Sequence, residues 1–367
     1  MWITILIFVA ILSVLIFVHE LGHFITARKS GMGVEEFGFG FPPRIFGIKR
    51  KGIIYSINLI PIGGFVKILG ENGEEKNNPK SFARRPIWQR ALVLVAGVSM
   101  NMILAIIALF VAFEIGLPQA LEGNEKNVSN QKVQIVQILK NSPAEQAGIK
   151  VGDEVLKMNK KDINSVVKFQ DLTKKLGGKK TSLTIRRDGK EEKIKITPRK
   201  DPPVEEGPLG VAIVETGIVE YHWYESLWKG FVTTFTFAGM IIMAFYDIIK
   251  NLIISKPIGV ELSGPIGIAV LTHEMTKLGF VYILQFVAIL SINLAIINIL
   301  PLPALDGGRL LFLAIEAIRR KPVTQKIENL VHTIGFGALM LLMVAVTFRD
   351  VVKFKDIFIN LWNRIIG

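Results

Sequence analysis

The sequence contains no cysteine, and this absence excludes two kinds of site. There are 0 Cys and only 5 His among the 367 residues. Disulfide bonds and thiolate metal ligands are therefore ruled out, so a transition-metal site has to be built from histidine and carboxylate side chains. Cysteine usage also gives no indication of the redox compartment.

Acidic residues are scarce relative to basic ones. Lys and Arg total 44 and Asp and Glu total 31, which gives a formal net charge of +13. No recognised nucleic-acid-binding motif accompanies this charge, so we predict no nucleic-acid partner. The basic residues instead crowd the segment between Arg28 and Arg90 and recur at residues 319–321. Such clusters are typical of the cytoplasmic ends of membrane spans.

Long apolar runs are the main feature that is present. Hydrophobic residues make up 50% of the chain, and several stretches reach the roughly 20 residues that span about 30 Å of hydrocarbon. The first run lacks a basic n-region and a small-residue cleavage site. We therefore interpret it as a retained helix rather than a signal peptide.

A soluble domain interrupts these runs. Residues 131–198 contain strand-like stretches and one short helical stretch with a glycine stop, and "NSPAEQAGIKVGDEV", residues 141–155, resembles the signature of bacterial PDZ domains. We predict a polytopic α-helical membrane protein in a lipid bilayer. It has about four transmembrane helices, a membrane-associated β-hairpin and one extracytoplasmic PDZ-like α/β domain.

The predicted organisation has eight parts along the chain. They are a first transmembrane helix, 1–30; a cytoplasmic-side loop with a β-hairpin, 31–90; a second transmembrane helix, 91–116; the PDZ-like domain, 117–205; an extracytoplasmic or membrane-surface helical linker, 206–278; a third transmembrane segment, 279–320; a fourth transmembrane helix, 328–348; and an amphipathic C-terminal helix, 349–367.

The apolar segment 225–253 is long enough to be a further span. If the basic loop after the first span is cytoplasmic, a span here would place the basic residues 319–321 outside the cell. That placement goes against the charge rule for cytoplasmic loops. We therefore predict a helix that lies on the membrane surface or packs against the protein.

A β-hairpin is predicted between the first two spans. Two β-rich runs, Arg44–Lys49 and Ile53–Leu59, flank a turn at residues 50–52. An edge strand here offers main-chain groups to an extended substrate segment by β-addition. A plain cytoplasmic hairpin is the alternative. Tyr55→Pro and Ile57→Pro, which remove ladder donors, distinguish the two.

The first span carries the pattern HExxH. On a helix this spacing places His19 and His23 on one face, where they can share a metal, and the intervening Glu20 can act as general base. Ionisable groups inside a span are costly without a partner such as a cation. We therefore predict zinc as the cofactor.

A third ligand has to come from elsewhere, because a catalytic zinc usually has three protein ligands and a water. Asp306 is the stronger candidate. It lies in "NILPLPALDGG", where Pro301 and Pro303 break helix geometry, and irregular backbone at membrane depth is tolerated where it lines a cavity. His332, near the start of the fourth span, is the weaker candidate.

Distances along the helices place both halves of this site at similar depth. His19 lies nine residues before Arg28, about 14 Å along a helix, and Asp306 lies thirteen residues before Arg319, about 19 Å. Both are measured from basic ends that we predict to be cytoplasmic. A four-span topology therefore brings the two together, whereas five spans would separate them.

These features together resemble the site-2 protease family, and most closely the bacterial RseP-type intramembrane zinc metalloproteases. The resemblance covers nearly the whole chain, although some members have two tandem PDZ domains and this chain shows one. It is carried by "HELGH", "NILPLPALDGG", the PDZ-like insert, "LSGPIGIA" at 262–269 and "GFGF" at 38–41.

The resemblance implies a set of roles. Both histidines of HELGH and Asp306 would ligate zinc, Glu20 would be catalytic, and Asn298 and Pro301 would help hold the substrate. The implied substrates are single-span membrane proteins trimmed first by another protease, such as anti-sigma factors or signal-peptide remnants. The implied location is the bacterial inner membrane, with the zinc site nearer the cytoplasmic side.

Three other classes of function fit parts of the sequence. A membrane scaffold that has lost catalysis would not need the expected active residues, all of which are present. A transporter also contains broken helices and ionisable groups, but gives no reason for the HExxH spacing. A tethered zinc peptidase of soluble substrates does not explain a motif inside a span. The PDZ-like domain has two open roles, which are binding a newly exposed C-terminus and filtering substrates by size.

Overall fold

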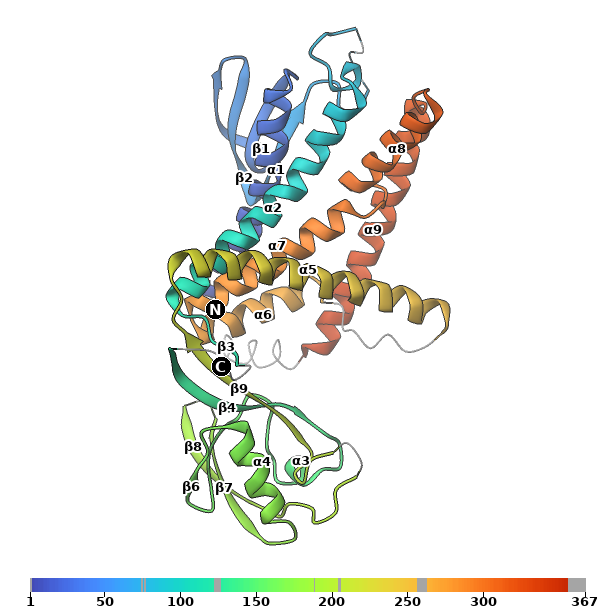
Figure 1. The fold of residues 1–367 in the computed structure, drawn as a ribbon. Coiled ribbons are helices and arrows are strands. Elements are labelled where there is room, and N and C mark those ends of the chain that lie inside the picture. Colours follow the sequence, from blue (N-terminus) through green and yellow to red (C-terminus); the bar gives the residue numbers. More distant parts are fainter. Residues whose placement is uncertain are drawn as a thin grey trace, which may run out of the picture. The chain divides into compact units, whose positions relative to one another are not determined.

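The computed structural model confirms the predicted fold class, a helical membrane protein with a β-hairpin and a PDZ-like α/β domain (Figure 1). It describes residues 2–73, 75, 77–121, 127–187, 189–203, 206–255 and 263–355. The chain forms two compact units, one from Met1–Ala112 with Tyr224–Gly367 and the other from Phe113–Trp223. Each unit is described below by itself.

The first unit is mainly helical. Five of its helices are long and apolar enough to cross a membrane within the described ranges, which makes it a multi-pass membrane protein. The prediction named four, and the additional candidate is α5, which we predicted to lie on the surface. The helices are α1 (Trp2–Lys29), α2 (Ile87–Ile115), α5 (Trp223–Ile253), α6 (Pro265–Leu278), α7 (Phe280–Ile299), α8 (Asp306–Arg319) and α9 (Gln325–Lys353), with a short 3-10 turn at Phe82–Arg84.

Small residues bring α1 and α2 into close contact. A Cβ added to Gly22 of α1 would overlap the backbone oxygen of Ala96, and a Cβ on Gly97 of α2 would lie 2.5 Å from His23 Nε2. Close backbone approach through small residues is a common way for helices to pack in membranes. The pairing therefore places one face of α2 directly against the HExxH face of α1.

The hairpin is longer and more folded than predicted. Its strands are β1 (Val34–Arg50) and β2 (Ile53–Ile68), joined by a turn whose Lys51 and Gly52 have φ of 50° and 84°. The register pairs the first half of β1 with both halves of β2. Four strand segments therefore lie side by side across the sheet, in the order 44–50, 53–58, 34–41 and 60–68.

This order changes which residues form the edge of the sheet. Tyr55 pairs with both Phe37 and Ile48, and Ile57 pairs with residues 39 and 46. Tyr55 and Ile57 therefore lie in an inner segment, and proline at either position tests the integrity of the sheet rather than its edge. One edge is the segment 60–68, which lies along α1, where Ser13 Oγ donates to Pro61 O at 2.6 Å.

The third membrane segment is broken where the sequence predicted. Helix α7 ends at Ile299, and α8 begins at Asp306. A Cβ on Gly307 or Gly308 would overlap backbone oxygens of the intervening turn, so the glycines permit this tight reversal. Arg90 of α2 donates to Glu316 of α8 through Nη1 at 3.0 Å, which holds α8 beside α2.

Two hydrogen bonds join α9 to the start of α6. The buried Asp350 of α9 accepts hydrogen bonds from the backbone amides of Gly264 at 2.9 Å and Gly267 at 2.8 Å, at the start of α6. This favourable placement of a carboxylate at a helix N-terminus joins α9 to α6.

Because α9 continues to Lys353, residues 349–353 of the predicted C-terminal helix belong to it, and residues 356–367 of that prediction lie outside the described residues.

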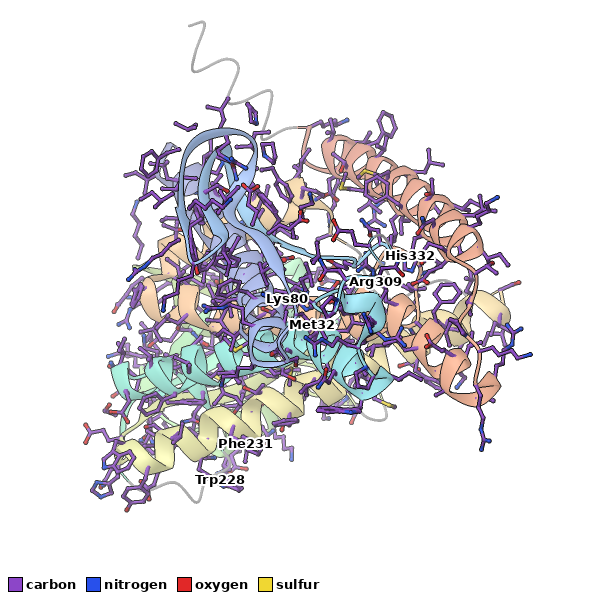
Figure 2. All side chains as sticks on the ribbon, turned by 90° about the horizontal axis from the view of Figure 1, so that it is seen from above. Met32, Lys80, Trp228, Phe231, Arg309 and His332 are labelled. Atoms are coloured by element: carbon purple, nitrogen blue, oxygen red, sulfur yellow. The ribbon has the colours of Figure 1, made fainter. Side chains whose placement is uncertain are left out.

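Helix α5 has a narrow buried stripe and a broad exposed face. The stripe recurs every four residues, at Ser226, Gly230, Thr234 and Ala238. A Cβ on Gly230 would lie 2.9 Å from the backbone nitrogen of Phe110, so this stripe contacts α2. On the exposed face, Trp228 stacks on Phe231 with ring centroids 5.6 Å apart (Figure 2).

In the part of the chain that the structure describes, the second unit is a sheet of seven strands with two helices. The strands are β3 (Gln119–Ala120), β4 (Val128–Ile138), β5 (Glu154–Met158), β6 (Lys161–Asp162), β7 (Thr181–Arg187), β8 (Lys190–Ile196) and β9 (Val211–Val219). Their order is β3-β9-β4-β5-β7-β8, with β6 paired to β5. The helices are α3 (Pro143–Gln146) and α4 (Val166–Lys175). The structure therefore adds β9 to a domain whose predicted end was residue 205.

The PDZ-like signature residues have structural roles in this unit. Ser142 caps α3 by accepting a hydrogen bond from the backbone nitrogen of Glu145 at 3.2 Å. Asp153, which is 1% exposed, accepts hydrogen bonds from the Lys150 amide at 2.8 Å and from Arg187 Nε at 2.8 Å. The first contact caps the helix that begins in the SPA part, and the bond between Lys150 and Asp153 joins the AGIK part of the signature to the GD part.

Candidate metal centre

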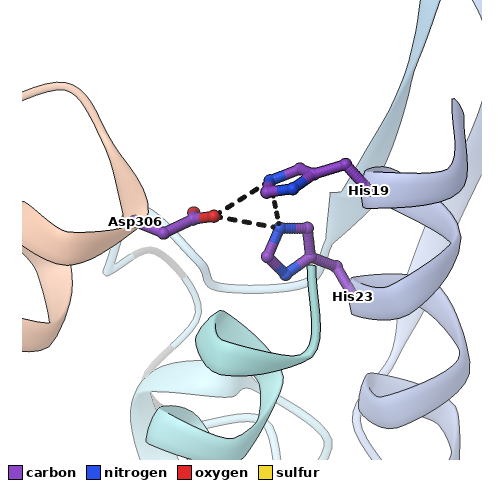
Figure 3. A group of neighbouring side chains, drawn as sticks. All are labelled: His19, His23 and Asp306. Atoms are coloured by element: carbon purple, nitrogen blue, oxygen red, sulfur yellow. Dashed lines mark hydrogen bonds and ion pairs between the residues drawn. The ribbon is translucent and has the colours of Figure 1, made fainter. Parts of the chain in front are cut away.

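Three side chains from two distant parts of the chain meet at one point. The distances are 3.1 Å between His19 Nε2 and His23 Nε2, 3.0 Å between His19 Nε2 and Asp306 Oδ2, and 3.3 Å between His23 Nε2 and Asp306 Oδ2 (Figure 3). Among the residues that the structure describes, this is the one group of three or more His, Cys, Asp or Glu side chains positioned to hold a metal ion.

Local structure explains why these side chains converge. His19 and His23 are one helical turn apart on α1, so both project from the same face. Asp306 is the first residue of α8, where the broken third segment turns back into a helix. Both histidines are buried, at 7% and 6% exposure. The three side chains that the sequence predicts as ligands therefore meet where both histidines are buried.

The donor atoms fit a zinc ion. Zinc takes histidine nitrogen and carboxylate oxygen at about 2.0–2.2 Å, so ligand atoms around a tetrahedral zinc lie about 3.3–3.6 Å apart. The three observed separations, 3.0–3.3 Å, are within a few tenths of an ångström of that spacing. Three protein ligands also leave a fourth position open for water, as catalytic zinc sites require.

Helix α2 supports both histidines from behind. His23 Nδ1 lies 2.8 Å from the backbone oxygen of Val93, which can accept only if Nδ1 carries the proton. His23 Nε2 is then left as the metal-binding nitrogen. On the other histidine, Nδ1 lies 3.4 Å from the side-chain amide of Asn101.

Glu20 lies beside this group and contacts the hairpin. Its Oε2 accepts a hydrogen bond from the backbone nitrogen of Val66 at 3.0 Å. A cavity of about 220 Å³ adjoins it, with Asn298 in its wall. Pro301 is exposed and follows the end of α7. The cavity is lined by Ile16, His19, Glu20, Leu294, Asn298, Ala304, Leu305 and Asp306.

The weaker third-ligand candidate, His332, lies outside the group. Its Nδ1 accepts a hydrogen bond from the backbone nitrogen of Ala304 at 2.8 Å, and it lies on α9 near Arg309 of α8 (Figure 2). His332 therefore supports the turn before Asp306 and is not part of the ligand group.

Comparison with known proteins places the chain in a family. The family model "Peptidase family M50" matches residues 7–342. This chain belongs to peptidase family M50. Because its curated relatives are zinc metalloproteases and the ligand group fits zinc, the protein is a zinc metalloprotease of this family.

Several curated relatives match along almost their whole length. A putative zinc metalloprotease of Fusobacterium nucleatum is 35% identical, covering 95% of this chain and 99% of that protein. One of Brucella suis is 32% identical, covering 95% and 94%. The regulator of sigma-W protease RasP of Bacillus subtilis is 30% identical, covering 95% and 98%.

One solved structure is also similar to part of this M50 protease. It is the PDZ domain of an SdrC-like protein of Listeria monocytogenes, 16% identical, with a TM-score of 0.22, covering 24% of this chain and 93% of that chain.

Sequence reasoning missed the contributions of α2 and of the hairpin edge. Asn101 was the stronger available signal, because a polar side chain inside an apolar span needs a partner. Gly97 gave a weaker signal, and the Val93 carbonyl and the Val66 amide gave none because they act through the backbone.

Proposed function

We propose that this M50 protease cleaves single-span membrane proteins within their transmembrane segments. The observation behind this proposal is that two of the three ligand side chains, His19 and His23, lie with Glu20 on α1, an apolar helix with a mean hydropathy of 2.5 over its candidate span. A peptidase of soluble substrates has no need to place these costly groups at membrane depth.

In this mechanism His19, His23 and Asp306 would hold zinc, which would lower the pKa of a bound water towards about 7 and polarise the scissile carbonyl. Glu20 would accept a proton from the attacking water, whose oxygen bonds to the carbonyl carbon. Glu20 would then pass that proton to the amine nitrogen as the C–N bond breaks. The cavity of about 220 Å³ beside Glu20 supplies room for the peptide group and the attacking water.

Two elements are suited to hold an unwound substrate. Asn298 lines the cavity and offers an amide that can donate to or accept from a peptide group. Pro301 follows the C-cap of α7 and keeps the turn beside the cavity non-helical. The hairpin edge, residues 60–68, extends to Glu20 and offers main-chain groups for β-addition.

The basic flanks of the spans support an orientation with the zinc site nearer the cytoplasmic side. Arg28 and Lys29 end α1, and Arg319 ends α8. The meeting of His19 with Asp306 supports the topology in which α5 does not span. The PDZ-like domain is then extracytoplasmic, where it admits single-span substrates already trimmed by another protease, such as anti-sigma factors or signal-peptide remnants, in a bacterial inner membrane.

Cleavage of tagged single-span proteins, reconstituted with the full chain, tests this function. We expect wild type to cut outer-trimmed substrates, and Glu20→Gln to retain zinc without cutting. His23→Ala and Asp306→Ala should lose zinc as well as cleavage. Cleavage of the same segment only after its extraction into solution would instead indicate a tethered peptidase of soluble substrates.

A further inference from the structure

We propose that Asn101 is a positioning residue of the metal centre, whose side-chain oxygen accepts the Nδ1–H of His19 and holds His19 Nε2 toward the metal. This inference rests on the zinc ligation proposed above. It concerns a residue of α2 that belongs to neither motif of the ligand set.

Asn101 places a buried polar side chain beside His19. The residue is 0% exposed and lies in the middle of an apolar helix. Its side-chain amide is 3.4 Å from His19 Nδ1, and within the described part of the chain its Oδ1 has no hydrogen-bond partner. A buried carbonyl without a partner is costly, so the position calls for a donor.

The chemistry of a bound histidine identifies that donor. A ligating imidazole nitrogen must be unprotonated, and His19 presents Nε2 to the other two ligand atoms. The ring proton therefore resides on Nδ1, where it faces Asn101. Two N–H groups cannot bond to each other, but a half-turn of the amide exchanges its nitrogen and oxygen. Oδ1 then accepts the Nδ1–H.

The second histidine provides an internal parallel. His23 Nδ1 has the backbone oxygen of Val93 as its acceptor, on the same face of α2 and about two turns before Asn101. Metal-ligating histidines almost always donate their other ring N–H in this way, which fixes the tautomer and the ring orientation. Asn101 supplies to His19 what the backbone supplies to His23.

A purely structural role for Asn101 can be separated from this one. Its backbone oxygen accepts a hydrogen bond from Ser291 Oγ of α7 at 2.7 Å. That contact joins two helices without involving the side chain of Asn101. Ser291→Ala therefore perturbs the same helix contact and leaves the proposed acceptor in place, which makes it the matched control.

The test is zinc affinity of the purified full-length protein, measured by competition with a chelator. We expect Asn101→Leu, which has similar volume and no acceptor, to bind zinc on the order of 10- to 100-fold more weakly. Asn101→Asp, which keeps an acceptor, and Ser291→Ala should stay within about threefold of wild type. Cobalt substituted for zinc should show a changed visible spectrum only in the Leu variant.

Two results would overturn the inference. One is wild-type zinc affinity in Asn101→Leu, and the other is an equal loss in the Leu and Asp variants with intact thermal unfolding. Should Asn101→Leu not fold, Asn101→Ala is the second variant without an acceptor. His23→Ala is measured in parallel to distinguish failure of the Asn101 inference from failure of the proposed zinc ligation. Zinc retention in His23→Ala would refute the ligand set itself.

Discussion

Helix α2 passes the ligand group at a glycine, Gly97, where a side chain would meet both histidine rings, and substituting this glycine is the sharpest test of the site geometry. A Cβ on Gly97 would lie 2.5 Å from His23 Nε2, 2.7 Å from His23 Cε1 and 2.8 Å from His19 Cε1. Gly97→Ala therefore directs a methyl group at both ligand rings, and at the metal-binding nitrogen of one of them.

The required displacement follows from these distances. Ordinary van der Waals contact begins at 3.4 Å, so ring and methyl must move apart by about 0.9 Å. Metal sites tolerate about 0.2 Å in ligand distances, and a 1 Å misplacement of a catalytic group can cost about 100-fold in rate. We expect zinc affinity to fall at least about tenfold and cleavage to fall about 100-fold.

The assay compares Gly97→Ala with two other helical glycines. Gly239 of α5 and Gly337 of α9 have nothing within 4 Å of an added Cβ, and alanine there should raise helix stability by roughly 0.5–1 kcal/mol. Zinc per chain, chelator competition and cleavage are measured for all three variants. Full zinc affinity and wild-type cleavage in Gly97→Ala would refute the close approach of Gly97 to the rings of His19 and His23.

Three further predictions follow from other contacts. Val66→Pro removes the backbone amide that donates to Glu20 from the hairpin edge, residues 60–68, so cleavage of membrane substrates should fall at least about tenfold. Val66→Ala keeps the amide and should retain most activity. Equal cleavage rates in the two variants would exclude a role for this edge. Asp350→Ala leaves two amides at the start of α6 without their buried acceptor and should destabilise the protein by about 2–3 kcal/mol in thermal unfolding, whereas an unchanged melting temperature would contradict this cap. Because the chain has 0 Cys, single cysteines at Phe231 and Leu252 can report the topology of α5: labelling of both from the same side is expected, and labelling from opposite sides would make α5 a span.

The ligand group was predictable because its residues are tied to local patterns. HExxH has meaning only on a helix, and the apolar run around His19 and His23 guarantees one. Asp306 follows two prolines and precedes two glycines, a combination that breaks a span at a definite point. Similar distances from the basic helix ends then predict that the two halves of the site lie at the same depth.

The hairpin was predicted only in its central part. Glycine and proline are depleted in strands, so the runs around Pro42, Pro43, Pro61 and the glycines at 63–64 gave no strand signal. The structure nevertheless continues both strands through them, because the inner segments 34–41 and 53–58 have neighbours on both sides and pair with the outer segments 44–50 and 60–68. Tertiary pairing determined this sheet, and a local pattern cannot reveal which segment becomes its edge.

The register between α1 and α2 explains why α2 is essential to a site whose ligands it does not supply. Val93, Gly97 and Asn101 recur every four residues and so lie on one face of α2, as His19 and His23 do on α1. The Val93 carbonyl orients one ring, Gly97 makes room for both, and Asn101 meets the other. Since each residue turns a helix by about 100°, no other helical phase presents these three groups together. The precision of the metal centre therefore depends on the sequence of α2 as much as on the motifs that bind the metal.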